Sequence, residues 1–320
     1  ASNGPFEHFD GLGETGWSLL AQAVNHWHMP AAELVRPFRV LPDWRLDDLM
    51  ISFSVPGGGV GPHIDQYDVF IIQGMGSRRW RVGDKLPMRQ FCPHPALLHV
   101  DPFPPIIDED LQPGDILYIP PGFPHDGITH ETALNYSVGF RGPNGRDLIS
   151  SFADYVLEND LGGEHYSDPD LTCREHPGRV EEYELERLRG MMIDMIRQPE
   201  DFKQWFGSFV TTPRHELDIA PAEPAYEEEE VVDALLGGEK LSRLSGLRVL
   251  HIGDSFFVHS EQLDTTDAEA LDALCRYTSL GQEELGSGLQ NQAFVSELTR
   301  LINQGYWFLA QVWRKESPCR

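Results

Sequence analysis

Residues 47–84, DDLMISFSVPGGGVGPHIDQYDVFIIQGMGSRRWRVGD, decide the fold of this chain. The runs ISFSV, DVFIIQG and RRWRVGD are short and rich in β-branched and aromatic residues, and clusters of glycine and proline separate them. This pattern is typical of strands joined by tight turns. Two more such runs, DILYIP and LNYSVGF, continue the pattern to residue 140. Many short strands with such turns predict a β-barrel or sandwich over residues 46–140.

Outside this strand-rich region the sequence predicts helices. One helix is expected around Gly16–His28, before the strands. After Gly145 the apolar spacing changes, and helices are expected over RDLISSFADYVLEND (146–160), from about Val180 to Gln198, and over DFKQWFGSFV (201–210). A small helical module buries little apolar surface by itself, so we expect this region to pair two copies of the chain as a homodimer.

The C-terminal third predicts a separate module. The segment PRHELDIAPAEPAYEEEE, rich in proline and charge, is interpreted as a linker. Beyond it, LRVLHIGDSFFVHS predicts a hairpin around Gly253–Asp254 with helices on both sides, an order that indicates a winged-helix-like module. The chain is therefore expected to be a multidomain α+β protein. Its domains would be a barrel over 1–143, a helical dimerisation region over 144–212 and a winged-helix-like domain over 213–320.

Charge and cysteine content limit the expected partners and location. The chain has 320 residues and a formal net charge of -26. An acidic surface repels phosphate backbones and attracts cationic partners, although such a charge also serves solubility alone. We therefore expect a basic protein partner and no direct nucleic acid contact. The four cysteines form no C-x-x-C pair, and neither a membrane-spanning run nor a signal-peptide pattern is present, which together predict a cytoplasmic protein.

His63 and Asp65 form the strongest chemical signal. Residues i and i+2 of a strand point to the same side, so both side chains can bind one metal ion. His125, in GDILYIPPGFPH, is the expected third ligand, and His130 is the alternative. Two histidines and one carboxylate leave three open positions on an octahedral ion, the pattern of non-haem iron(II) oxygenases. An H-x-D pair alone is more often a buried or surface pair with no metal. Here the pair follows a glycine-rich loop and lies among predicted strands, and this context favours a metal site.

Arg78 is a candidate anchor for a dicarboxylate co-substrate. It follows the Gly74–Gly76 turn, and its planar guanidinium matches the geometry of a carboxylate. Alternation along the strand places it on the same side as Trp80, with Arg79 and Arg81 on the other side. One of these two pairs is then expected to be surface charge.

The strand before the H-x-D motif carries a second polar face. Alternate residues of this strand share one side: Asp48, Met50, Ser52 and Ser54. As a pocket wall, this side offers hydroxyls to the co-substrate and a carboxylate to a cationic substrate group; the alternative is the solvent face of an edge strand. Tyr67 is expected to point toward the substrate, and Asn135 to line the co-substrate pocket.

At these residues the chain resembles the JmjC-type oxygenases, a branch of the cupin superfamily. Among them it is most similar to the bacterial ribosomal oxygenases that hydroxylate an arginine of a large-subunit ribosomal protein. The resemblance extends from residues 47–84 to PGDILYIPPGFPHDG, LNYSVGFRGPN, FADYVL, LGGEHYSDPD, FKQWFG and RHELDIAP. It covers nearly the whole chain, although family members carry strands and helices before GPFE that are mostly missing here.

The resemblance implies a double-stranded β-helix (the jelly-roll barrel of cupins), a helical dimerisation region and a winged-helix C-terminal domain. It implies Fe(II) as cofactor and 2-oxoglutarate and O₂ as co-substrates. The implied metal ligands are His63, Asp65 and His125. The residues implied to bind 2-oxoglutarate are Arg78 and Ser52, and those implied to surround the substrate arginine are Asp48, Met50 and Tyr67.

Three other functions are compatible with the residues. They are a JmjC-type demethylase or hydroxylase of another basic protein, a non-catalytic cupin-like binding module, and a zinc or manganese cupin that acts on a small molecule. No aromatic cage for a methylammonium group is evident in the sequence. The complete ligand set argues against a binding module, and Arg78 and Asp48 favour 2-oxoglutarate and a peptide over a small molecule.

Overall fold

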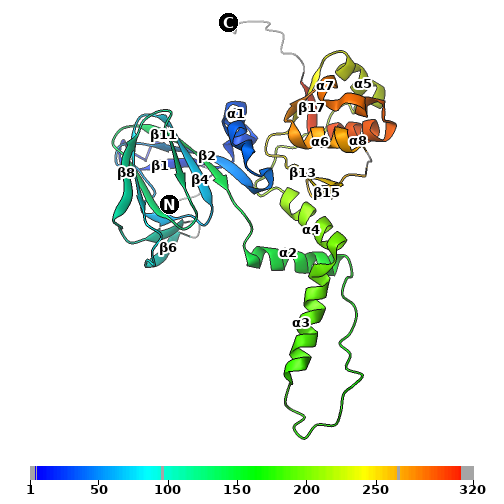
Figure 1. Ribbon diagram of the computed structural model, residues 1–320. Coiled ribbons are helices and arrows are strands. Elements are labelled where there is room, and N and C mark those ends of the chain that lie inside the picture. The colour runs from blue at the N-terminus through cyan, green and yellow to red at the C-terminus, as the bar shows by residue number, and fades with distance from the viewer. Residues whose placement is uncertain (1–3, 5, 95–96, 265–266, 311–320) are drawn as a thin grey trace. The chain divides into compact units, whose positions relative to one another are not determined.

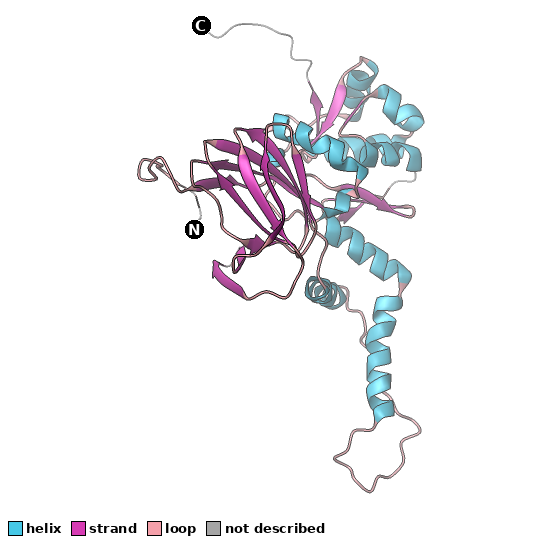
Figure 2. Cartoon of the chain, turned by 60° about the vertical axis from the view of Figure 1, so that its left-hand side comes forward, coloured by secondary structure: helices cyan, strands magenta, loops and turns pink. Residues whose placement is uncertain are grey.

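The computed structural model describes residues 4, 6–94, 97–264 and 267–310, whose contacts define two compact units. The first unit runs to Gly142 and includes two short later pieces, Arg214–Asp218 and Leu244–Gly246. The second unit holds residues 143–213, 219–243 and those from 247 onward. Strands dominate the first unit and helices the second (Figure 1; Figure 2). The predicted mixture of helix and sheet is confirmed, whereas the three domain boundaries stay predictions.

Two antiparallel sheets form the first unit. One has five strands, in the order β1 (Ser18–Ala21), β2 (Leu46–Ser54), β11 (Ala133–Phe140), β4 (Asp68–Met75) and β9 (Ile116–Ile119). The other has six, in the order β6 (Gln90–His94), β7 (Leu97–Val100), β3 (His63–Ile64), β10 (Pro124–Thr129), β5 (Arg78–Gly83) and β8 (Pro105–Leu111). From β2 to β5 and from β8 to β11 the chain alternates between the sheets, which is the expected double-stranded β-helix.

Apolar side chains cover both faces of the five-stranded sheet. Between the sheets, Ile71 of β4 and Trp80 of β5 belong to one buried cluster. On the outer face, Leu49 of β2 and Phe140 of β11 pack in a second cluster with residues from the helical segments that precede β2. These segments are η1 (Val24–His26), α1 (Met29–Val35), η2 (Arg36–Val40) and η3 (Asp43–Arg45). The sheet is thus held from both sides, which fixes the direction of its inward-facing polar residues.

The helix predicted around Gly16–His28 was wrong. The structure has a strand at Ser18–Ala21, which pairs antiparallel with residues 51–54 of β2, and only a single 3-10 turn at Val24–His26. The backbone groups along the edge of β2 need hydrogen-bond partners, and a local helix would have left them unpaired. Regular helix begins only at Met29.

Three helices open the second unit and confirm the predicted ones. They are α2 (Gly145–Glu158), α3 (Glu182–Arg197) and α4 (Pro199–Thr211). Asn144 caps α2, where its side chain accepts from the backbone N–H groups of Arg146 and Asp147. Pro199 ends the α3 pattern and begins α4, as expected of a residue that suits the first turn of a helix.

The rest of the second unit contains the predicted hairpin and helices. The hairpin is β13 (Val249–Ile252) and β14 (Ser255–Val258), extended by β15 (Glu261–Gln262). The other elements are α5 (Glu228–Leu236), β12 (Lys240–Arg243), α6 (Ala268–Arg276), β16 (Ser279–Leu280), α7 (Gln282–Leu285), η4 (Gly286–Gln290), α8 (Gln292–Asn303) and β17 (Trp307–Ala310). The sequence YWFLAQVW (306–313) also predicts a final strand, and its last three residues lie outside the described residues.

Helix α4 packs directly on this hairpin. A side chain at Gly207 would lie only 2.5 Å from the Phe257 ring, and the Ser260 N–H donates to Thr211 Oγ1 over 3.0 Å. In the described part of the chain, no helix has both the length and the apolar character needed to cross a bilayer.

Candidate active site

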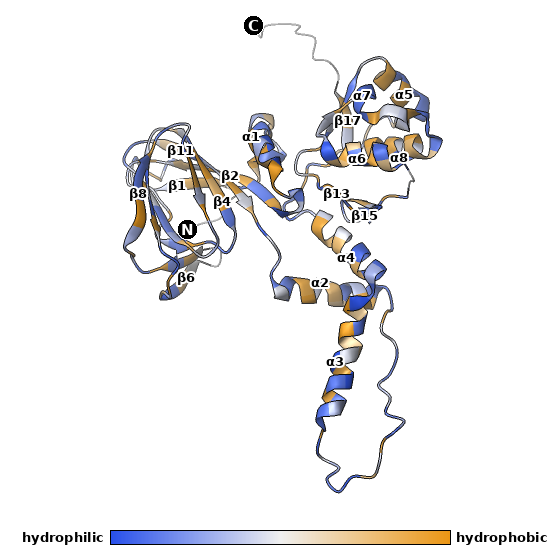
Figure 3. Ribbon diagram, viewed as in Figure 1, coloured by the Kyte–Doolittle hydropathy of each residue, from blue (hydrophilic) through white to orange (hydrophobic). Residues whose placement is uncertain are grey.

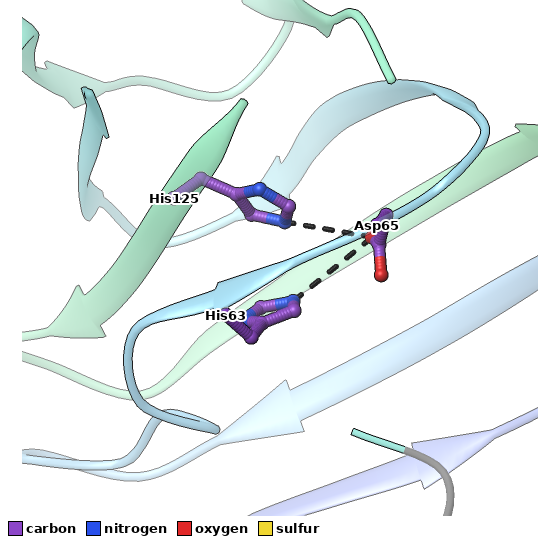
Figure 4. Close-up of side chains that lie close together, drawn as sticks. All are labelled: His63, Asp65 and His125. Carbon is purple, nitrogen blue, oxygen red and sulfur yellow. Dashed lines mark ion pairs between the residues drawn. The ribbon is translucent and has the colours of Figure 1, made fainter. Parts of the chain in front are cut away.

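The sheet pairing brings His63, Asp65 and His125 together at one end of the barrel interior. His63 lies on β3 and Asp65 directly follows it, while His125 lies on β10. His125 is the cross-strand partner of His63, and directly paired residues project from the same side of a sheet. The two imidazole rings are 4.2 Å apart between centroids, and both face the Asp65 carboxylate (Figure 4).

Backbone carbonyls fix how the two imidazoles point. His63 Nδ1 lies 2.8 Å from the Gly61 carbonyl oxygen, and His125 Nδ1 lies 3.1 Å from that of Phe123. A carbonyl only accepts, so each Nδ1 carries the proton and each Nε2 keeps its lone pair. The two Nε2 atoms lie 4.0 and 3.5 Å from Asp65 Oδ2. All three potential donors therefore face one point with their lone pairs free.

Burial sets the charge state of the cluster. Burial first, and then the neighbouring His125, lower the pKa of His63 to about 4. Burial opposes ionisation of Asp65, but its interactions with His125 and His63 outweigh that effect and lower the pKa of the Asp65 carboxyl. At neutral pH, His63 is thus neutral and Asp65 ionised, which are the forms that bind metals.

The geometry of the three side chains suits a single metal ion. Their nearest ligand atoms lie within 4.8 Å of one another, and two adjacent donors each about 2.1 Å from one ion would be about 3–4 Å apart. His63 and His125 are buried and Asp65 is half-buried. His130, the alternative third ligand, is exposed and lies outside this cluster. Two imidazoles and one carboxylate fit a divalent transition metal that keeps open positions.

Arg78 lies buried in the same barrel interior, with 2% of its surface exposed. Its Nη1 donates to Ser52 Oγ and Asn135 Oδ1 over 3.3 and 3.2 Å, and its Nη2 donates to the Gly127 carbonyl over 2.8 Å. The guanidinium lies 4.8 Å from the centre of the Trp80 ring, and that ring lies 6.2 Å from the His125 ring. Trp80 therefore connects the arginine to the metal cluster.

Among the described residues, the charge of Asp126 acts on Arg78, but no carboxylate lies in ion-pair contact with the guanidinium. No Asp or Glu among the described residues forms an ion pair with it, and its buried Nε finds no hydrogen-bond partner among them. Burial lowers the pKa of the guanidinium to about 10, so it stays protonated at neutral pH. An unpaired buried cation is costly, and a bound carboxylate would offset that cost.

The three candidate substrate residues lie along the same interior. Asp48 and Met50 lie on the side of β2 that also carries Ser52, and Met50 pairs across to Ser137 of β11. Asp48 Oδ2 accepts a hydrogen bond from the Ala23 N–H over 2.7 Å. Burial, followed by the charges of Asp65 and Asp48, raises the pKa of Tyr67. Tyr67 is thus close to both the metal cluster and Asp48.

Two residues that the sequence did not single out complete the Arg78 pocket. Gln73 is buried and accepts from the Asn135 side-chain amide, while its own amide donates to the carbonyls of Met75 and Gly76. This holds Asn135 with its oxygen toward Arg78. A side chain at Gly127 would lie 2.8 Å from Arg78 Nε and 2.9 Å from the Trp80 ring, so only glycine fits there.

The barrel and its His–Asp–His cluster define a JmjC-type oxygenase of the cupin superfamily. Residues 33–148 match the JmjC domain family, and residues 194–308 match the ROXA-like winged helix family. The chain is 64% identical over 307 residues to the ribosomal protein uL16 3-hydroxylase of Escherichia coli (strain K12), covering 96% of this chain and 82% of that protein. The chain therefore belongs to the family of JmjC ribosomal oxygenases.

Solved structures give the same result. The ribosomal oxygenase YcfD from Escherichia coli in complex with cobalt and 2-oxoglutarate superposes with a TM-score of 0.90 at 61% identity, over 97% of this chain and 83% of that one. YcfD in complex with cobalt and succinic acid superposes equally well, with the same identity and coverage. The expected family, barrel and winged-helix domain are confirmed.

Proposed function

We propose that this chain hydroxylates an arginine side chain of a large-subunit ribosomal protein, with Fe(II), 2-oxoglutarate and O₂. The observation that carries this proposal is a buried two-histidine, one-carboxylate cluster connected through one tryptophan to a buried arginine without a carboxylate partner among the described residues. The relative named for hydroxylating uL16 and the relatives holding cobalt with 2-oxoglutarate or succinate support it.

We assign the metal to His63, Asp65 and His125 and the 2-oxoglutarate carboxylate to Arg78, with Ser52 and Asn135 beside it. Iron and 2-oxoglutarate together supply the oxidising chemistry, in which 2-oxoglutarate loses CO₂ to become succinate and one oxygen atom of O₂ ends on the substrate carbon. The protein's residues position the co-substrate and shield the site from water. Arg78 fixes the far carboxylate of the co-substrate, and Trp80 and Ile71 exclude water from between the sheets.

The substrate side chain would lie between Asp48, Met50 and Tyr67. A guanidinium offers five donors in a planar fork, which a carboxylate such as Asp48 accepts well. The apolar stem of an arginine would pack on Met50 and the Tyr67 ring. A basic ribosomal protein also suits the net charge of -26, and we expect it to meet this enzyme in the cytoplasm.

The test is anaerobic loading with Fe(II) and 2-oxoglutarate, addition of an arginine-containing uL16 peptide and air, and mass spectrometry of the products. We expect one oxygen atom added to the arginine and one succinate formed for each, both dependent on 2-oxoglutarate. Succinate without oxidised peptide would retain the oxygenase and reject the arginine substrate. Loss of a methyl group from a methylated peptide, with no stable hydroxylation, would favour a demethylase instead.

Asp48→Asn should raise the KM for the peptide by about 10- to 100-fold, since a hydrogen bond to a charged group contributes about 1.5–3 kcal/mol. The amide oxygen still accepts from the Ala23 N–H, so the local fold is preserved. The KM for 2-oxoglutarate should not change. Steady-state kinetics with each substrate varied separately checks this, and Asp108→Asn on exposed β8 is the control. A wild-type peptide KM in Asp48→Asn would remove Asp48 from the substrate pocket.

We also propose that α3 pairs two copies of the chain. Apolar side chains along this helix are at least 45% exposed: Tyr183, Leu185, Leu188, Met192 and Ile196. Figure 3 shows apolar residues recurring along α3. A row of this size is typical of an interface rather than of a solvated helix.

Leu188→Glu together with Met192→Glu should therefore convert a dimer into a monomer. Light scattering should give about half the mass of the unaltered protein, with metal and 2-oxoglutarate binding retained. Asp194→Lys, on the opposite side of the same helix, should remain dimeric. A single-chain mass of 36.2 kDa for the unaltered protein would contradict the dimer.

A further inference from the structure

The segment Arg214–Asp218, which the sequence places in a linker, belongs to the barrel unit. Arg214 Nη1 forms an ion pair with Asp47 Oδ1 at 3.0 Å, and its Nη2 donates to the Arg141 carbonyl over 3.4 Å. Side chains along the segment alternate between half-buried and exposed, as in an extended chain lying on a surface. The segment is therefore an integral part of the barrel unit and lies at the start of β2.

His215 is the residue of this segment that clusters with Asp48, one of the candidate substrate residues. One of its ring nitrogens lies within 4.8 Å of carboxylate oxygens of both Asp47 and Asp48. The ring packs edge-on against His26 at 5.7 Å, and His26 in turn closes over Gly246, where a side chain would lie 2.6 Å from its ring. His215 is thus held in place on one side and points its polar edge toward the carboxylates.

The two carboxylates beside His215 differ in how they are satisfied. Asp47 is neutralised by Arg214. Asp48 accepts the Ala23 N–H, and no Lys or Arg among the described residues forms an ion pair with it. A half-buried carboxylate that lacks a cationic partner and lies next to a histidine nitrogen can accept a cation from outside.

We propose that His215 is a positioning residue that holds a substrate guanidinium against Asp48 and favours it over an ammonium group. This rests on the proposed function of the site. A guanidinium spreads its donors over a plane, so one edge can reach Asp48 while another N–H donates to a ring nitrogen of His215. A lysine ammonium is a compact point charge that lacks this spread, so it cannot satisfy both groups as well.

A second metal ion is the competing explanation for the same three side chains. Asp47, Asp48 and His215 together offer the donors that a divalent ion would need. However, the Arg214 guanidinium already lies 3.0 Å from Asp47. A divalent ion at this place would have to displace that cation or lie against it, so the geometry favours an organic cation contributed by the substrate.

The test compares His215→Leu and His215→Gln in the full chain loaded with Fe(II) and 2-oxoglutarate. His215→Leu removes the acceptor at similar size and should raise the KM for an arginine peptide about 10-fold. It should also lower the ratio of oxidised peptide to succinate, because a poorly held side chain uncouples the two products. The KM for 2-oxoglutarate should stay unchanged. His215→Gln retains an acceptor oxygen and should recover most of the loss.

Glu216→Ala is the matched control, since Glu216 is the exposed neighbour in the same segment. A lysine peptide is the second probe. Its turnover should be poor in the unaltered enzyme and insensitive to His215→Leu. Equal rises in KM for the peptide and for 2-oxoglutarate would mean a structural role and would overturn the proposal. So would an unchanged arginine KM and coupling ratio in His215→Leu. If the unaltered enzyme itself leaves arginine peptides unoxidised, the proposed function fails, and this inference fails with it.

Discussion

His63→Ala should abolish metal binding and turnover together. Even residues that only support a metal ligand typically change affinity or activity by 10- to 100-fold, so the loss of one of three ligands should exceed about 100-fold. The remaining Asp65 and His125 cannot fix an ion on one face while leaving three positions open. Calorimetric titration with Fe(II) under anaerobic conditions and succinate release in air measure the two losses.

His130→Ala is the matched control, because His130 is exposed and outside the cluster, although a histidine in that turn was the alternative third ligand. It should retain the metal affinity and the turnover of the unaltered chain, whereas His125→Ala should behave like His63→Ala. Metal loss in His130→Ala with retention in His125→Ala would reverse the ligand assignment.

Arg78→Met should lower the affinity for 2-oxoglutarate by about 10²- to 10³-fold. Removing one partner of a buried charge pair costs about 3–5 kcal/mol, since the other charge is left without compensation. Methionine keeps the length of the side chain and suits the contact with Trp80, so the barrel should still fold. The Kd for Fe(II) should stay unchanged, which separates this variant from a loss of the metal site.

Arg79→Met provides the comparison at the neighbouring position. Arg79 lies on the outer side of β5, where it pairs with Asp108 at 2.6 Å on an exposed surface. Exposed ion pairs contribute little, so 2-oxoglutarate affinity should be that of the unaltered protein. If Arg78→Met bound 2-oxoglutarate normally, the carboxylate would have to be held elsewhere, and the assignment of the pocket would be wrong.

Much of the barrel could be predicted because its central strands alternate clearly. The runs around Met50, Ile71, Trp80, Leu117 and Ser137 all form strands, as expected. Two of the elements that the sequence did not reveal, β1 and β8, are edge strands. β1 was predicted to be helix because its pairing depends on the distant edge of β2, and β8, PIIDEDL, carries three acidic residues that suit a loop equally well. A single-sequence pattern records local periodicity and not the strand that lies beside it.

In the site too, the sequence predicted residues whose role depends on local spacing and missed residues whose role depends on contacts across strands. His63 and Asp65 were found from their spacing together with the strands and the glycine-rich loop around them, and the direction of Arg78 followed from strand alternation. The roles of Gln73 and Gly127 were not visible, because each depends on a contact with Asn135 or Arg78 across strand pairing. His215 was missed because a segment rich in proline and charge reads as a linker. A histidine in the middle of such a segment was the one available signal.

The barrel unit is discontinuous along the chain, and this has a consequence for its synthesis. Its last pieces, Arg214–Asp218 and Leu244–Gly246, emerge about 70 and 100 residues after Gly142, and at about 5–20 residues per second the whole interval lasts roughly 5–20 s. Until these pieces emerge, Asp47 cannot form its ion pair with Arg214, and the His26 ring cannot pack against the backbone at Gly246. A nascent chain can thus bring its candidate metal ligands together early, but it completes the segment proposed to hold the substrate late. On that proposal, selectivity for arginine would arise only when most of the chain has left the ribosome.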